Sequence, residues 1–124
     1  MWAGLGRSRE KSAAMRPFEC AIVRPGDSRW AAMLERCPHE FYHWPGYVRL
    51  EAERMAGEAA ALWVGGRAGE WLCPVVLRSV ASVPGVQPEA AQWQDAVTPY
   101  GYPHPLYWVE HADEAEYLRA ALAA

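Results

Sequence analysis

His39, Glu40 and His43 have the spacing H-E-x-x-H, with which zinc hydrolases bind their metal on a helix. That chemistry needs the two imidazoles one helical turn apart, a glutamate that acts as base toward a zinc-bound water, and a third ligand. Arg49 stands where the extended zinc-protease pattern has its third ligand, and Pro45 limits a helix across the motif to about one turn. A structural loop is therefore favoured, and zinc hydrolysis stays an alternative hypothesis.

A second motif, RMAGEA at residues 54–59, fits the R/Q-x-x-G-x-G/A loop that holds the pyrophosphate of acyl-CoA in Gcn5-related acetyltransferases. Such a loop must follow a strand and begin a helix, so that free N–H groups and the helix dipole face the phosphates. Here the order is reversed, because a helix predicted to begin at Pro45 runs into Gly57 and a strand follows. Gly57 is therefore predicted to end that helix and not to bind a cofactor.

The most specific stretch is DAVTPYGYPHP at residues 95–105. Tyr100 and Tyr102 flank Gly101 between prolines, and proline fixes the backbone dihedral φ and excludes a regular helix. Two phenol hydroxyls on a rigid, extended backbone are what the wall of a binding pocket requires. Tyrosines that pin the loop to the sheet are the structural alternative.

This stretch resembles the sequence D-x-x-S/T-P-Y-G-Y-x-G-P of the FemAB-like, Gcn5-related N-acyltransferases, which include peptidoglycan aminoacyltransferases and acetyltransferases of polysaccharide gene clusters. HEFYHWPGY at 39–47 is similar to the family's H-D-x-Y-x-x-P-x-Y entry into its second helix, and LCPVVLR at 72–78 is similar to its L-P-L-L-x-R strand. Order and spacing agree from about residue 20 to residue 122. His104 departs from the pattern, since the family usually has glycine there.

The resemblance implies an α/β fold with a mainly antiparallel sheet flanked by helices. It also implies acyl transfer from a thioester or an aminoacyl ester to an amine, with acyl-CoA or aminoacyl-tRNA as the family's co-substrate and no cofactor held in this chain. The expected contacts with the acceptor are Tyr100, Tyr102 and Asp95, with Tyr42 and His43 behind them.

Members of this family are at least twice as long as this chain of 124 residues, and their acyl-donor site lies in the later of two similar halves. The chain resembles the earlier half, so we expect a truncated protein that is inactive alone. Its expected partners are the missing C-terminal half or a second copy, and its acceptor a small amine or a cell-envelope precursor. The alternative from another class is a non-catalytic interaction module, the remnant of a split gene, that docks on a catalytic partner.

Local patterns predict the elements that would position these residues. They are a strand at 18–23, a helix capped by Asp27 or Ser28 that ends near 36, the helix from Pro45, a hairpin of strands 59–64 and 70–80, a loop at 81–94, a strand around 95–108, and a helix from Asp113 onward. Pro74 lies inside the second hairpin strand, so that strand must be an edge there or be interrupted by a bulge.

Composition limits the remaining choices. The net charge of -3 argues against a purely electrostatic nucleic-acid binder, and no apolar run is long enough for a membrane span. Three cysteines without a C-x-x-C pair fit a reducing cytoplasm, where we expect the protein. We expect a disordered tail at 1–14, a natural start at Met15, and one half-domain at 15–124 that uses seven Trp and six Tyr in core and pocket.

Overall fold

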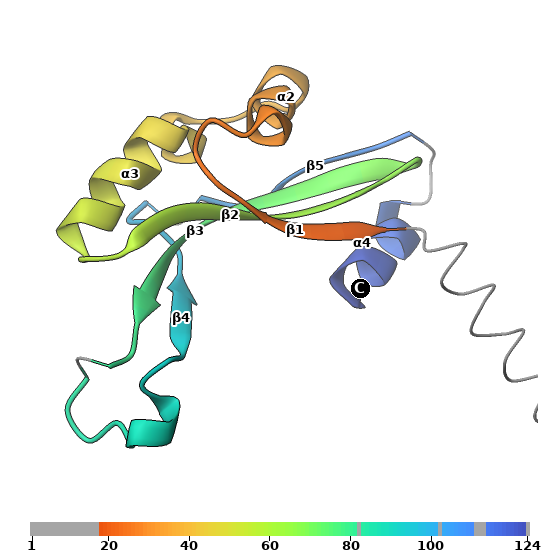
Figure 1. Cartoon of the computed structure of the whole chain (residues 1–124). Helices are drawn as coiled ribbons and strands as arrows, with labels where there is room; N and C mark the ends of the chain where they lie inside the picture. Colours follow the sequence, from red (N-terminus) through yellow and green to blue (C-terminus); the bar gives the residue numbers. More distant parts are fainter. Residues whose placement is uncertain (1–17, 82, 102, 111–113, 124) are drawn as a thin grey trace, which may run out of the picture.

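The computed structural model describes residues 18–81, 83–101, 103–110 and 114–123. Its sheet is antiparallel throughout and contains β1 (Glu19–Val23), β2 (Glu58–Gly66), β3 (Gly69–Ser79), β4 (Gln94–Val97) and β5 (Leu106–Val109). The helices are α2 (Ser28–Arg36), α3 (Pro45–Arg54) and α4 (Glu114–Ala123), with 3-10 turns η1 (Phe41–His43) and η2 (Pro88–Ala90). The expected class, α/β with a mainly antiparallel sheet flanked by helices, is confirmed (Figure 1).

Strands β4 and β5 lie along the same edge of β3. Val97 of β4 pairs with Val76, and Leu106 of β5 pairs with Leu72. Between these pairs, residues 98–105 face only residues 73–75 of β3, so the longer segment must leave the sheet. Pro74 pairs with Ala61 of β2 on one side and lies in the stretch of β3 that has no partner on the β4–β5 side. The predicted interruption is therefore present, and it lies in the neighbouring segment between β4 and β5.

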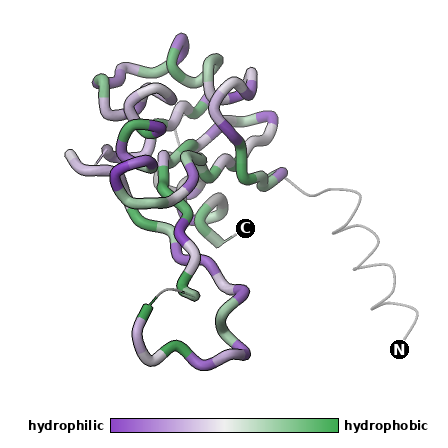
Figure 2. Tube along the Cα trace, turned by 60° about the vertical axis from the view of Figure 1, so that its left-hand side comes forward, coloured by the Kyte–Doolittle hydropathy of each residue, from purple (hydrophilic) through white to green (hydrophobic). Residues whose placement is uncertain are grey.

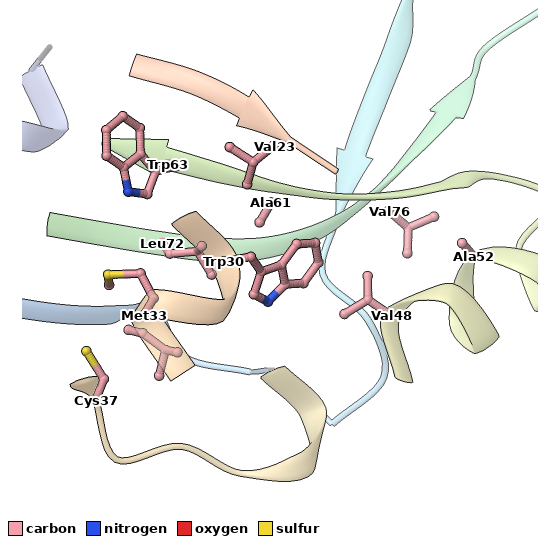
Figure 3. Close-up of a cluster of buried hydrophobic side chains, with 11 residues drawn as sticks. Val23, Trp30, Met33, Cys37, Val48, Ala52, Ala61, Trp63, Leu72 and Val76 are labelled. Carbon is pink, nitrogen blue, oxygen red and sulfur yellow. The ribbon is translucent and has the colours of Figure 1, made fainter. Parts of the chain in front are cut away.

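One face of the sheet is covered by α2 and α3 (Figure 1). The main cluster of buried side chains lies between these two helices and the sheet. Figure 3 shows the indole of Trp30 at its centre, with Val48 and Val76 beside it. Trp30 and Met33 are fully buried, and each such side chain contributes about 2–3 kcal/mol through the apolar area that it removes from water. The predicted helix at 28–36 is confirmed, and Asp27 caps it by accepting the N–H of Arg29.

Helix α3 ends in a Schellman motif. The N–H of Ala56 donates to the carbonyl of Glu53, and the N–H of Gly57 donates to that of Ala52. The left-handed position belongs to Ala56, with φ +53°, so the helix ends just before Gly57, the residue that the sequence predicted to stop it. Gly57 is required for a different reason: a Cβ there would come within 2.6 Å of the Leu77 carbonyl oxygen.

Two of the tryptophans donate their indole N–H groups to one carboxylate beside α2. The indole N–H groups of Trp63 and Trp108 donate to the two carboxylate oxygens of Glu70, at 2.8 and 3.1 Å. Arg36 stacks on the ring of Trp108, 3.4 Å from its centroid. This cluster joins β2, β3, β5 and α2, so these tryptophans are structural.

Helix α4 lies on the opposite side of the sheet from α2 and α3 (Figure 1). Beside it is an apolar groove of about 410 Å³, here called the second-face groove, whose lining includes Cys20, Ile22, Leu62, Val64, Trp71 and Leu122. The expected tail at 1–14, the start at Met15 and the helix start at Asp113 lie outside the described residues. No helix of the described part is long and apolar enough to cross a membrane.

Candidate functional site

The candidate site is the loop at residues 98–105, called the 98–105 loop, which leaves the sheet between β4 and β5. Pro99 and Pro103 are buried, and neither can donate a backbone hydrogen bond to a sheet ladder. Tyr100, between them, keeps 68% of its surface exposed. The prolines therefore fix the loop to the body of the protein, while the ring of Tyr100 faces solvent.

Helix α3 holds the backbone of Tyr100 at both of its polar groups. The hydroxyl of Tyr47 donates to the Tyr100 carbonyl oxygen at 2.9 Å, and the Tyr100 N–H donates to Oε2 of Glu51 at 3.2 Å. Tyr47 and Glu51 lie one turn apart on α3 and so face the loop together. These bonds leave the phenol of Tyr100 available for a ligand.

Glu51 is a buried carboxylate that is already fully engaged. The guanidinium of Arg54 donates to both of its oxygens, at 3.2 and 2.9 Å, in addition to the bond from the Tyr100 N–H. The Arg54 bond is the main cause that lowers the pKa of Glu51 below its ordinary value, and burial opposes it. Burial raises the pKa of Tyr47, and the nearby Glu51 charge adds to the rise. The Glu51 carboxylate, paired with Arg54, therefore works as an ionised anchor for the loop and not as a free base.

His43 fastens the far end of the loop from inside the core. Its ring is fully buried, with Nε2 2.8 Å from the carbonyl oxygen of His104 and Nδ1 3.1 Å from the Glu40 nitrogen. The carbonyl needs a donor and the Glu40 N–H needs an acceptor, so the geometry fits the neutral imidazole with its proton on Nε2. The carbonyl of His43 itself accepts the indole N–H of Trp30 at 2.9 Å.

Tyr42 supports the loop through the close packing of its ring against Gly101. Gly101 has φ +96°, and a Cβ at this position would overlap the ring of Tyr42, so only glycine fits. The Tyr42 ring packs against Phe41 and meets the edge of Tyr47, with centroid distances of 4.0 and 5.5 Å. Tyr42 and His43 thus lie against the loop, and their part in binding an acceptor stays a prediction.

Asp95 occupies a different position. It lies on β4, opposite Arg78 of β3, and the guanidinium donates to both carboxylate oxygens at 3.0 and 2.6 Å. Arg78 therefore lowers the pKa of Asp95. Asp95 and Arg78 therefore form a cross-strand ion pair at the base of the loop. Tyr102, the other predicted contact, lies outside the described residues.

The H-E-x-x-H motif does not form the helix that a zinc hydrolase needs. Glu40 precedes the single 3-10 turn η1, and His39 lies before that turn, with its Nδ1 near the Cys37 carbonyl. Both ring nitrogens of His43 are engaged by backbone groups. Within the described ranges, no three side chains of the metal-binding types come together. The motif therefore forms a structural turn.

Sequence reasoning did not find Tyr47 and Glu51 as anchors of the loop. The available signal was position: Glu51 falls between Val48 and Ala52 on the apolar stripe of the helix, where an acid needs a partner. Comparison of the chain with protein-family models, curated proteins and solved structures finds no match.

Proposed function

We propose that this chain supplies the acceptor-binding part of a FemAB-like, Gcn5-related N-acyltransferase. The observation that carries the proposal is the 98–105 loop, whose D-x-x-T-P-Y-G-Y sequence resembles the family's and whose backbone is held from α3 and η1. A loop fixed in this way presents an exposed aromatic ring with little ordering cost when a ligand binds.

The proposed roles follow from the contacts of the described residues and, for Tyr102, from the motif resemblance alone. Tyr100 is the proposed contact with the acceptor, Tyr102 a second one, and Asp95 with Arg78 a fixed charge pair at the base of the loop. Tyr42 and His43 act behind the loop as supports. Cytoplasmic location belongs to the proposal, because its acyl donors are cytoplasmic and the three cysteines form no disulfide.

Acyl transfer also needs a donor site and a route for a proton. The amine nitrogen attacks the carbonyl carbon of the thioester or aminoacyl ester, the thiol or ribose hydroxyl leaves, and the amine loses a proton. Glu51, the carboxylate bonded to the loop, already accepts three hydrogen bonds. The proposal therefore gives this chain acceptor binding, and assigns acyl-CoA or aminoacyl-tRNA to a partner half or a second copy.

The test is a ligand-observed NMR titration with a panel of amines that includes amino sugars and peptidoglycan stem peptides. We expect at least one amine to bind, Tyr100→Ala to weaken binding at least about tenfold, and Trp93→Ser, a comparably exposed aromatic on another loop, to leave it unchanged. Failure of every amine to bind, or equal effects of the two variants, would contradict the proposal. Micromolar binding of acetyl-CoA to the chain alone would contradict the assignment of the donor site elsewhere.

A second candidate function, a non-catalytic interaction module, is favoured by one observation. The second-face groove is lined by apolar side chains, and Ile22 and Leu122 remain 55% and 70% exposed in it. Exposed apolar surface of this kind is typical of sites where another protein docks. Concentration-dependent association without binding of any amine would favour this candidate over the first.

A further inference from the structure

A second loop departs from the sheet just before β4 and projects from the body of the protein (Figures 1 and 2). The described residues of this segment, 80–81 and 83–93, are here called the arm. It carries exposed Trp93 and Val83 and a single charged residue, Glu89. Large apolar side chains on a projecting loop cost hydration free energy unless a partner covers them.

The arm has a defined shape before any partner binds. The N–H of Val80 donates to the carbonyl of Trp93 at 3.1 Å and closes the base of the loop. Further backbone bonds follow inside it, from Val83 to Val80, from Ala90 to Gln87, and from Trp93 to Ala90. Because the backbone is already ordered, docking of its apolar side chains would cost little conformational entropy.

The second-face groove has matching chemistry. Its lining is apolar apart from the thiol of Cys20, and it contains no charged residue. The arm projects away from α4 and its C-terminal end in both views, so the arm does not fill the groove of its own chain (Figures 1 and 2). Every copy therefore carries one apolar projection and one apolar recess that are both open.

We propose that the arm of one copy docks in the second-face groove of a second copy, and that the contact is reciprocal. A two-fold axis would satisfy both arms and both grooves in one closed dimer, whereas a single contact would leave one of each exposed. A buried aromatic side chain removes roughly 150–250 Å² from water, so two small contacts correspond to a weak dimer. The inference does not depend on the proposed acyltransferase function.

The groove has no charged residue and the arm has only Glu89, which predicts how the association responds to salt. Attraction between exposed charges is screened as ionic strength rises, whereas burial of apolar surface is not. We therefore expect the dimer dissociation constant to change less than about threefold between low salt and physiological salt. A loss of tenfold or more over that range would assign the association to charges and overturn the proposal.

The test is sedimentation equilibrium of the full chain over micromolar to millimolar concentrations. We expect dimer in the wild type and a dissociation constant at least about tenfold higher in Trp93→Ser, in the arm, and in Ile22→Glu, in the groove. Leu50→Glu is the matched control, since Leu50 is 61% exposed on α3 outside the groove, and it should not change the constant. Circular dichroism verifies that each variant folds, and Leu122→Glu replaces Ile22→Glu if the edge strand is disturbed.

Mixing the two defective variants gives a sharper result. The intact arm of Ile22→Glu fits the intact groove of Trp93→Ser, so the mixture should form a heterodimer through one contact that neither variant forms alone. A wild type that stays monomeric throughout, a dimer that survives both substitutions, or a mixture that associates no better than its components would overturn the proposal.

Discussion

Two loops flank β4, and they are stabilised in opposite ways. The 98–105 loop is held by side chains from α3 and η1 that are far away in the sequence, including Glu51, Tyr47 and His43. The arm is ordered by short-range backbone bonds within itself. The first loop is thus built into the core of the fold and presents one exposed ring, whereas the arm projects and presents several apolar groups. A fixed loop suits recognition of a small ligand, and a projecting one suits a protein partner.

Removal of the His43 ring should have the largest effect on the first loop. His43→Ala leaves the His104 carbonyl and the Glu40 N–H without their partner and opens a cavity in the core. We expect a loss of about 3–5 kcal/mol in the free energy of unfolding, measured by urea titration. His43→Gln, which can still donate toward His104, should recover part of that loss. A loss below about 1 kcal/mol would show that the loop does not depend on this contact.

Two glycines with positive φ allow a matched comparison of the loops. Gly101 has φ +96° and Gly85, in the arm, has φ +84°, but only at Gly101 would a Cβ meet a neighbour, the ring of Tyr42. Gly85→Ala should cost about 1 kcal/mol from the left-handed backbone alone, and Gly101→Ala about 3 kcal/mol because Tyr42 must also move. Chemical denaturation of both variants checks this. Equal losses would mean that the packing of Tyr42 contributes nothing.

The Glu51 anchor should add a dependence on pH. Its folded pKa lies below the ordinary value of about 4.5, so the carboxylate stabilises the fold above that pH, and the stabilisation is lost as pH falls through the lowered value. Glu51→Gln keeps an acceptor for the Tyr100 N–H but loses the charge that faces Arg54. We expect it to be about 1–2 kcal/mol less stable at pH 7.

Urea denaturation curves at several pH values measure the difference in the free energy of unfolding between Glu51→Gln and the wild type. The difference between the two proteins should shrink below about pH 4. Asp95→Asn is the comparator, because its ion pair with Arg78 is half exposed, and it should change stability less. A Glu51→Gln deficit that is constant from pH 7 to pH 3 would contradict the role of the charge.

The sequence predicted those parts of the fold that depend on neighbouring residues. The cap at Asp27, the start of α3 at Pro45 and the glycine-rich hairpin between β2 and β3 each follow from local backbone chemistry, and all three are confirmed. The stop of α3 at Gly57 was predicted as well, but the close packing of Gly57 on Leu77 was not, because it involves a distant strand.

The residues that anchor the 98–105 loop could not be predicted either, because their contacts also join segments far apart in the sequence. Glu51 and Tyr100 are 49 positions apart, Tyr47 and Tyr100 are 53 apart, and His43 and His104 are 61 apart. Periodicity within one helix shows that a face is buried but not which segment covers it. The motif stretch itself was visible, because proline and glycine restrict the backbone wherever they occur.

The arm should respond least to substitution, although it carries a tryptophan, the largest type of side chain. Trp93→Ser removes an indole that is 64% exposed, and at protein concentrations where the chain is monomeric we expect a change below about 1 kcal/mol in the free energy of unfolding. Urea titration at low micromolar concentration measures this value, and Trp30→Ala, which empties a fully buried position, is the opposite extreme. If Trp93→Ser instead destabilises the monomer as strongly as Gly101→Ala does, the arm packs on its own chain and the contrast between the two loops fails. A small effect at low concentration, combined with loss of the dimer at high concentration, would mean that the indole stabilises an interface and contributes little to the fold.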